Sequence, residues 1–532
     1  MNREGTIVIV VLVIVVLLTY ACYQFVDRMA VENIAAKTQS EITQLGTCVS
    51  SGEELLRTLL AYPTSVREQW GGIYDQQKLL RSRIVYDRAV PYGRGRFTVI
   101  APRLAEDKVA GLRFGMVNES GKLSLGGLLD WERRQPGVAR QALLQLPGME
   151  KRVADSLLDW IDSDSMTREE GAEAAEYGGL GVGVMAVTPP NTIVRTLDDL
   201  LPVSGMSGLL LLGPDRNANF HVSVKEQLIA ESNNTALDTM EPRMAEFESG
   251  SLPWSYYLTP YSAERNQSRD GRPRIHLNDP DLIRLHSELI KRFPSSWANF
   301  ILLYRQFGPS SEVGGNPKTS EVVIDIKLPA QFSIGTIYDL LGARVRIPIN
   351  TADPSAESQL WLSPFSIRPK ELGQYLQEFA DQVTVSPRRI LSGRVNINRA
   401  LRPVLLAVPG LNEELVEKIL EIRGDPEQER KQVLPKSFTH ESWLLTKGLV
   451  ELHQMRALAP YVTTRGAVYR GQIVGYFDQG PLALRTEVVM DATFSPPRTI
   501  FHRDLHHLGR GYSLDVLQGG RLSSEEDVIE EF

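Results

Sequence analysis

The sequence predicts an α+β fold that begins with one long helix, and three observations support this prediction. An apolar run of membrane-spanning length, residues 6–26, follows a short charged leader. Helical periodicity dominates the middle of the chain, which includes two pairs of helices that are each joined by a Pro-Gly turn. Three segments near the C-terminus, residues 466–477, 484–493 and 499–505, have the composition and turn boundaries of β-strands.

The N-terminal segment has the layout of a leader followed by a membrane anchor. The leader ends at Gly5, and the apolar run starts at once with Thr6 and reaches Val26. A helix needs roughly 20 such residues to cross a bilayer, and no small-residue cleavage site follows, as a secretory signal peptide would require. The segment resembles the N-terminus of a type IV prepilin, which a prepilin peptidase would cut between Gly5 and Thr6. The alternative is an ordinary uncleaved signal anchor.

The composition indicates an anchored globular protein. Of the 532 residues, 42% are hydrophobic and 23% are charged, which is ordinary for globular domains. The formal net charge of −7 disfavours wrapping a polyanion. The two cysteines are Cys22, inside the anchor, and Cys48, just beyond it, so we expect no disulfide framework in the soluble part.

The segment after the anchor is predicted to continue as an amphipathic helix and then to enter a sheet. Met29, Ile34 and Ile42 recur at roughly helical spacing between polar residues. Residues 55–60 suggest another helix. Strand-like stretches bounded by proline and glycine follow at residues 83–85, 96–101 and 111–117.

Two segments share the form of a helix, a tight turn and a second helix. The first turn is Pro147-Gly148, inside a helical region over residues 125–159, and the second is Pro409-Gly410. Small and apolar side chains on the second helix of each pair can pack back on the first. Finding this arrangement twice is a weak internal repeat.

The remaining segments are assigned from composition alone. Residues 282–307 form a strongly helical piece, and a Gly/Ser loop follows at residues 308–317. Residues 425–436 are a charged linker, and residues 478–481 make the hairpin turn between the first two C-terminal strands. The tail, residues 523–532, is acidic.

Three features together resemble one family. The first is the prepilin-like N-terminus, in which the fifth residue after the predicted cut is Val10 in place of the usual pilin glutamate. The second is the run Leu-Asp-Trp-Ile-Asp-Ser-Asp at residues 158–164, with Gly-Ala-Glu at residues 171–173. The third is Arg-Val-Asn-Ile-Asn at residues 394–398, ahead of the second Pro-Gly turn and of a β-rich end. Together they resemble the minor pseudopilin K family of type II secretion systems (general secretion pathway protein K).

The resemblance implies a fold with three parts: an N-terminal transmembrane, pilin-like long helix, a pilin-like antiparallel β-sheet, and a large inserted α-helical domain with helix-hairpin-helix (SAM-like) elements. The domains expected on this basis are a leader at residues 1–5, a transmembrane helix at 6–26, an amphipathic helix with the first β segments at 27–120, an inserted helical domain with the acidic loop at 121–345, a second helix-hairpin-helix segment at 346–435, and a β-rich domain with the acidic tail at 436–532.

The resemblance also implies a non-enzymatic subunit at the tip of a periplasmic pseudopilus that assists protein export. Its partners would be other minor pseudopilins, the secretion apparatus and prepilin peptidase. It would cross the inner membrane once, with the soluble part in the periplasm. Val10 fits a tip position, because a subunit with no neighbour above it has no α-amino group to neutralise. Two departures are the extra residues 233–329 and the Gly-rich stretch at residues 178–183.

A dense group of carboxylates after the first helix pair is the main candidate site. Six to eight hard oxygen ligands at irregular geometry suit Ca²⁺, and members of the resembled family bind calcium in this domain. The alternative is a solvated acidic loop. The candidate ligands are Asp159, Asp162, Asp164, Glu169, Glu173 and Glu176.

A second and weaker metal candidate lies at residues 215–226, which can be aligned with an EF-hand loop. Phe220 stands where that loop needs glycine, and Pro214 precedes it, so a plain turn is favoured. The histidine cluster at residues 502–507 has no cysteine nearby and is expected to be a surface feature. The oxygen ligands of the weaker candidate would be Asp215, Asn217, Asn219 and Glu226.

No catalytic motif is present, and the rival function is DNA binding. Helix-hairpin-helix motifs often hold DNA phosphates through backbone N–H groups, and competence DNA receptors combine such a motif with a membrane anchor. Here both turns contain proline, which lacks a donor, and acidic residues such as Glu150 and Glu413 lie beside them. We therefore expect no nucleic-acid partner and interpret the turns as packing devices.

Overall fold

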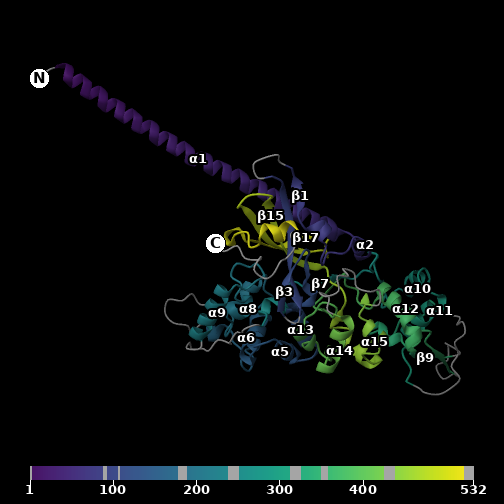
Figure 1. Ribbon diagram of the computed structural model, residues 1–532. Coiled ribbons are helices and arrows are strands. Elements are labelled where there is room, and N and C mark those ends of the chain that lie inside the picture. The colour runs from purple at the N-terminus through teal and green to yellow at the C-terminus, as the bar shows by residue number, and fades with distance from the viewer. Residues whose placement is uncertain are drawn as a thin grey trace.

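The computed structural model describes residues 3–87, 93–105, 108–177, 188–237, 251–311, 325–348, 358–424 and 438–519. Figure 1 shows a long helix that projects from a globular body, a β-sheet that holds the inner end of this helix, and a mostly helical part beyond the sheet. The Gly-rich stretch at residues 178–183, the charged linker and the acidic tail lie outside the described residues.

One continuous helix, α1 (Arg3–Ala61), joins the anchor to the sheet. Apolar side chains in its first half are exposed, whereas Cys48 and Leu56 near its end are buried. Among the described residues it is the one helix long and apolar enough to cross a membrane. The prediction of a separate helix at residues 55–60 is wrong. These residues continue α1 because no proline interrupts it before Pro63 and its apolar face keeps contacting the sheet.

The main sheet has the strand order β1-β2-β15-β16-β17, with β3 paired to β2 and β4 paired to β15. Strands from the two ends of the sequence therefore lie side by side, since β15 pairs antiparallel with β2. Phe97, Val99 and Ile473 pack against the inner end of α1. The strands are β1 (Arg83–Tyr86), β2 (Gly95–Ala105), β3 (Lys108–Arg113), β4 (Val117–Asn118), β15 (Val468–Phe477), β16 (Ala483–Asp491) and β17 (Arg498–Asp504). The predicted strands are confirmed except at residues 111–117, where the chain bends after β3 and only its last residue belongs to β4.

The opposite face of the sheet is covered by a short C-terminal helix, α17 (Leu514–Gln518). Side chains alternate along a strand, so Val474 and Tyr476 of β15 point away from α1. They form a small core with Leu517 of α17, and Phe220 from the helical part packs against this core. The sheet is thus buried on both faces at this end.

The middle of the chain forms a mostly helical part around one hydrophobic core, which takes in residues on both sides of position 345. The predicted helix at residues 282–307 is two helices, because Pro294 lacks the N–H that a continuous helix needs. The domain limits given above stay predictions. The helices are α4 (Leu125–Arg134), α5 (Val138–Leu143), α6 (Lys151–Ile161), α7 (Ala174–Tyr177), α8 (Gly208–Leu212), α9 (Val224–Leu237), α10 (Leu282–Ile290), α11 (Ser295–Phe307), α12 (Pro369–Gln382), α13 (Arg402–Leu406), α14 (Glu413–Arg423), α15 (Trp443–Thr446) and α16 (Leu452–Leu458).

Short strand pairs and single turns complete the fold. Helices α2 (Thr64–Gln69) and α3 (Gln77–Leu80) lead from α1 into the sheet, and 3₁₀ turns lie at Glu119–Gly121, Leu197–Leu200, Trp254–Tyr256, Ile337–Leu340 and His506–Leu508. The short strands pair as β5 (Leu123–Ser124) with β6 (Leu258–Thr259), β7 (Ala263–Arg265) with β12 (Ile390–Ser392), β8 (Ile275–His276) with β11 (Val383–Thr384), β9 (Arg344–Pro348) with β10 (Ser358–Leu362), and β13 (Val395–Asn396) with β14 (Val462–Thr463).

Both Pro-Gly turns connect consecutive helices. Pro147-Gly148 lies between α5 and α6, and Pro409-Gly410 lies between α13 and α14, with the helices of each pair packed against each other. Gly148 and Gly410 have φ angles of +67° and +89°. Glycine adopts this left-handed conformation without the steric cost of a Cβ, so both turns depend on it.

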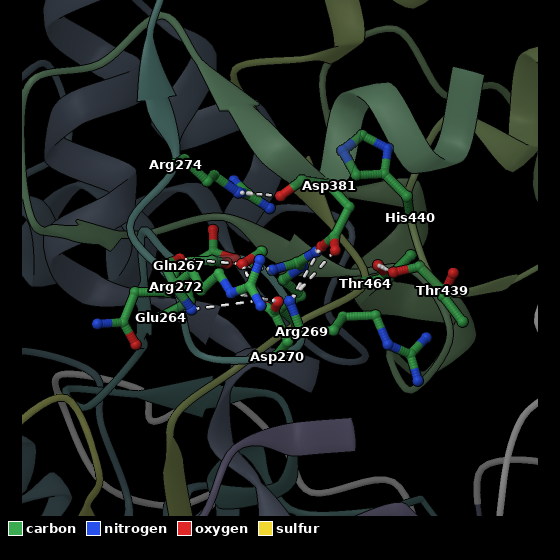
Figure 2. A network of polar contacts seen from close by, with 12 residues as sticks. Glu264, Gln267, Arg269, Asp270, Arg272, Arg274, Asp381, Thr439, His440 and Thr464 are labelled. Atoms are coloured by element: carbon green, nitrogen blue, oxygen red, sulfur yellow. Dashed lines mark hydrogen bonds and ion pairs between the residues drawn. The ribbon is translucent and has the colours of Figure 1, made fainter. Parts of the chain in front are cut away.

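A polar network ties the helical part to the segment just after α1 (Figure 2). Asp381, at the end of α12, accepts a hydrogen bond from the backbone N–H of Arg269 at 3.2 Å and forms an ion pair with Arg465. The backbone carbonyl of Asp381 accepts a hydrogen bond from Arg274 Nε at 3.1 Å. Arg269 pairs in turn with Glu68 of α2. Segments far apart in the sequence are thereby held together.

Candidate functional site

The acidic loop after α6 folds around one guanidinium group. Asp159, in the last turn of α6, is fully buried, and Asp162 follows directly after the helix. Arg168 Nη1 contacts Asp159 Oδ1 at 2.5 Å and Asp162 Oδ2 at 2.6 Å. The backbone N–H of Arg168 also donates to Asp159 Oδ2 at 3.1 Å. A single cation thus bridges two of the predicted ligands.

Two buried carboxylate oxygens in this loop have no hydrogen-bond partner among the described residues, namely Asp162 Oδ1 and Glu173 Oε1. Burial raises the pKa of Glu173, and the charges of Asp159 and Asp162 raise it further. Burial also raises the pKa of Asp159, although hydrogen bonds from Arg168 act in the opposite direction. The group therefore holds more negative charge than Arg168 neutralises.

The other predicted ligands lie at the edge of this group. Asp164 accepts from the backbone N–H of Met166 at 2.9 Å, and Glu176 accepts from the backbone N–H of Glu173 at 2.8 Å. The Glu169 side chain is 79% exposed and contacts Arg140 at 3.3 Å. As the side chains stand, no three His, Cys, Asp or Glu residues within the described ranges form a ready metal site.

The residues nevertheless fit the chemistry of a hard cation. Asp159, Asp162 and Glu173 supply carboxylate oxygens, two of which lack a partner, and Ca²⁺ binds such oxygens at irregular geometry. Gly171 lets the loop pass directly over Asp159, because a Cβ there would lie 1.9 Å from Asp159 Oδ2. Calcium binding by this loop stays a prediction.

Two arginines that were not predicted from the sequence, Arg140 and Arg168, organise this region. Arg140 of α5 binds Asp155 of α6 through two nitrogens, at 2.6 and 2.7 Å, and Asp155 is fully buried. This pair joins the two helices that flank the first Pro-Gly turn. One signal was available for Arg168, since it is the only basic residue between Asp159 and Glu176.

In the second candidate loop, residues 215–226, backbone N–H groups occupy the carboxylates. Asp215 accepts from Asn219 at 3.1 Å and from Phe220 at 2.7 Å. Glu226 accepts from the N–H groups of Arg216 and Ser223, both at 3.0 Å. The side chains of Asn217 and Asn219 likewise accept from backbone N–H groups two residues further on. The loop is thus closed by its own hydrogen bonds.

This loop also attaches the helical part to the sheet. The Ala218 carbonyl accepts from Gln472 of β15 at 2.8 Å and from Arg485 of β16 at 3.2 Å. Phe220 adopts a φ of +64°, a conformation that favours glycine, and its ring packs on the sheet core. Burial raises the pKa of Asp215 to about 6. The geometry is that of a docking loop.

The two Pro-Gly turns contact protein. The Pro147 carbonyl accepts a hydrogen bond from the indole N–H of Trp254 at 2.8 Å. A Cβ on Gly410 would lie 3.3 Å from the side chain of Leu458. Gly5 and Thr6 lie in the first turns of α1.

Comparisons with known proteins place the family resemblance in the helical part. A family model described as type II secretion system (T2SS), protein K, matches residues 127–212, which include α4, α5, α6 and the acidic loop. A search of curated proteins found no match.

Among solved structures, the chain is similar to a chain of the GspK-GspI-GspJ complex from the type 2 secretion system of enterotoxigenic Escherichia coli. The identity is 12% and the TM-score 0.30, with 88% of this chain and 98% of that chain covered. At this TM-score the likeness carries no argument of its own. On the family match over residues 127–212, the chain resembles type II secretion system protein K, and the resemblance drawn from its motifs is confirmed.

Proposed function

We propose that the protein is a non-enzymatic minor pseudopilin of a type II secretion system, which stands at the tip of the periplasmic pseudopilus and assists protein export. The observation that carries this proposal is the protein K match over residues 127–212. The long helix α1, exposed and apolar in its first half and packed on an antiparallel sheet at its end, supports the anchored, pilin-like half of the proposal.

The finer features of this role follow from the same resemblance. The chain would cross the inner membrane once through α1, with the soluble part in the periplasm. Prepilin peptidase would remove the leader after Gly5. The helix-hairpin-helix elements around Gly148 and Gly410 would serve protein packing, which the contacts of Pro147 with Trp254 and of Gly410 with Leu458 support.

Calcium is proposed as the ion of the acidic loop. Asp159, Asp162 and Glu173 would supply the ligands, and the two orphaned oxygens support this assignment. A divalent cation would offset the mutual repulsion of these carboxylates more fully than Arg168 alone. The loop at residues 215–226 is the weaker candidate, because its carboxylates are already occupied.

Assembly with the other minor pseudopilins of the same secretion system is the direct test of this function. When they are co-expressed and extracted in detergent, the chain should co-purify with them, and its loss should abolish export of the system's substrates. Recovery of the chain alone, with export unaffected, would contradict the proposal. Salt-sensitive binding of duplex DNA in the micromolar range would instead favour a membrane-anchored, competence-receptor-like DNA-binding protein.

A further inference from the structure

The guanidinium group of Arg168 stands in the acidic loop where a metal ion would stand. Its Nη1 atom lies 2.5 Å from Asp159 Oδ1 and 2.6 Å from Asp162 Oδ2. Calcium binds carboxylate oxygens at about 2.3–2.6 Å, so Nη1 is at the distance of a calcium ligand contact from both oxygens. Two cations cannot occupy one position. Calcium that uses these two oxygens therefore has to displace the guanidinium.

The guanidinium satisfies only part of this group of carboxylates. Asp162 Oδ1 and Glu173 Oε1 are buried and have no hydrogen-bond partner among the described residues. Asp162 is 9% exposed and Glu173 is 4% exposed, so solvent reaches neither of them freely. Together with Asp159, they place three carboxylates around one positive charge. A calcium ion carries twice that charge and accepts six to eight oxygen ligands, whereas the planar guanidinium donates only in fixed directions.

The Arg168 side chain has a direct way out to water. It is 21% exposed, and residues 163–167 and 169–170 on either side of it are exposed. The side chain can therefore turn outward without crossing the hydrophobic core. A charged head on a flexible stem is well accommodated in solvent.

The backbone of the loop is held independently of the guanidinium. The backbone N–H of Arg168 donates to Asp159 Oδ2 at 3.1 Å, and its carbonyl accepts from the N–H of Gly171 at 3.1 Å. The backbone N–H of Glu170 donates to Asp155 Oδ2 of α6 at 3.2 Å. Release of the side chain would thus leave the loop in place and keep the guanidinium close to the carboxylates.

We propose that Arg168 is an internal counterion that competes with calcium for Asp159 and Asp162. In the calcium-free protein the guanidinium bridges the two carboxylates and ties the loop to the end of α6. Bound calcium takes over the same oxygens, and the guanidinium turns to solvent. The loop therefore keeps its fold without the metal, and the apparent affinity for calcium is lowered by the need to displace Arg168. This inference rests on the calcium site given under the proposed function.

The first test measures calcium binding to the full chain in detergent by isothermal titration calorimetry. Arg168→Gln should bind calcium at least about tenfold more tightly than the wild-type chain, because the apparent dissociation constant rises as the fraction of molecules with a free site falls. Arg168→Lys keeps the competing charge and should stay closer to the wild-type affinity. Lys151→Gln is the matched control, because it removes one exposed positive charge at the start of α6, and it should leave the affinity unchanged.

The second test compares melting temperatures with and without the ion. In EDTA, Arg168→Gln should melt below the wild-type chain, because its carboxylates lose their counterion. In saturating calcium this difference should disappear, since the guanidinium no longer contacts the loop. The coupling between the residue and the ion is the same free energy that the affinities report. An equal deficit in both conditions would show that Arg168 stays in place when calcium binds.

The third test follows the guanidinium itself in the wild-type chain. Phenylglyoxal modifies exposed arginines, and mass spectrometry gives the rate at each position. Arg168 should be modified several-fold faster in saturating calcium than in EDTA, because the ion releases it to solvent. Arg388 is exposed and lies outside the loop, so its rate should not change. A general effect of charge on calcium affinity would not alter the labelling rate of Arg168.

The outcomes separate this inference from the calcium assignment. If neither the wild-type chain nor Arg168→Gln binds calcium, the calcium assignment is wrong and the inference falls with it. If the wild-type chain binds calcium but Arg168 is labelled at the same rate with and without it, the inference alone is overturned, whatever the affinity of the variant. Binding by Arg168→Gln alone would support the competition, with Arg168 excluding the ion. If Arg168→Gln does not fold in EDTA, the labelling of the wild-type chain decides.

Discussion

Buried charges in this protein are held by oppositely charged partners, some of which lie far away in the chain. Glu119 is fully buried and contacts Lys122 at 3.2 Å and Arg470 at 3.1 Å. Burial alone would raise its pKa, but these two cations hold the pKa at about 2. Removing one partner of such a group leaves an uncompensated charge, which is strongly destabilising. The acidic loop differs, because its carboxylates outnumber their cations.

The first prediction at this scale concerns calcium. If Ca²⁺ binds the folded loop only, it should stabilise the protein by roughly 2.7 kcal/mol at a hundredfold excess over its dissociation constant. Chelation should therefore lower the melting temperature of the detergent-solubilised chain. Asp162→Ala combined with Glu173→Ala should abolish this response, while Glu150→Gln, at an exposed position outside the candidate ligands, should keep it. A wild-type melting curve that EDTA leaves unchanged would show that the loop is only acidic surface.

The second prediction uses glycine to probe the close approach of the loop to α6. Gly171→Ala should lower the free energy of unfolding by about 1–3 kcal/mol, because its Cβ would displace the Asp159 carboxylate from Arg168. Gly373→Ala is the control, since Gly373 lies in α12 and a Cβ added there would meet no neighbouring atom within 4 Å. Alanine at position 373 should raise the free energy of unfolding by about 0.5–1 kcal/mol. Equal effects of the two changes in chemical denaturation would contradict the loop geometry.

The third prediction concerns pH. Burial lowers the pKa of His440 to about 4, against about 6.5 in an unfolded chain, so the folded protein keeps this ring neutral. Between pH 6.5 and 4 the unfolded chain binds a proton that the folded chain does not. The free energy of unfolding is therefore unaffected by His440 above pH 6.5. As the pH falls from 6.5 towards 4, protonation of the unfolded chain lowers this free energy by up to about 3 kcal/mol.

His440→Gln should therefore reduce the loss of melting temperature between pH 7 and pH 5. His453→Gln is the control, because the His453 side chain is 74% exposed, and it should keep the wild-type pH profile. If both variants follow the wild-type profile, the His440 ring is not held neutral in the folded protein.

Among the elements, the close contact between α1 and the sheet depends on two glycines, Gly52 and Gly475. A Cβ on Gly52 of α1 would lie 2.8 Å from Ile473 and 3.0 Å from Phe97, and a Cβ on Gly475 of β15 would lie 2.8 Å from the Leu45 carbonyl. The helix can therefore lie close to β2 and β15 only because glycine occurs on both sides.

Gly52→Val should force α1 away from the sheet and lower the free energy of unfolding by about 1–3 kcal/mol. Gly46→Val is a matched control in the same helix, because the nearest atom to its added Cβ lies at 4.0 Å. Proteolysis under native conditions should become faster at the inner end of α1 in the first variant only. Similar protease resistance of both variants would argue against this close packing.

The elements also divide by how well local sequence predicts them. The helix α1, the C-terminal strands and the helix pairs around Gly148 and Gly410 follow from periodicity and turn residues, and they could be predicted. The pairing of β7 with β12 joins Glu264 to Leu391, and nothing local in either segment indicates it. Arg168 was not predicted for a related reason. In the sequence it is an arginine among carboxylates, as on many protein surfaces, and only the fold shows that it contacts the buried Asp159.

In the whole molecule, the sheet joins the anchor helix α1 to the helical part of the chain. One face of the sheet holds the anchor helix α1, and the other face meets α17 and the docking loop that contains Ala218. The helical part with the protein K match is thus connected to the anchor through packed contacts.

N-terminal sequencing of the protein after extraction from the membrane decides whether the chain matures as a pseudopilin, because cleavage by prepilin peptidase separates a pseudopilin from an ordinary anchored protein. We expect Thr6 as the first residue, and we expect the Gly5→Leu variant to stay uncut but inserted, since the apolar run is untouched. An intact Met1 on the wild-type protein would contradict the pseudopilin assignment.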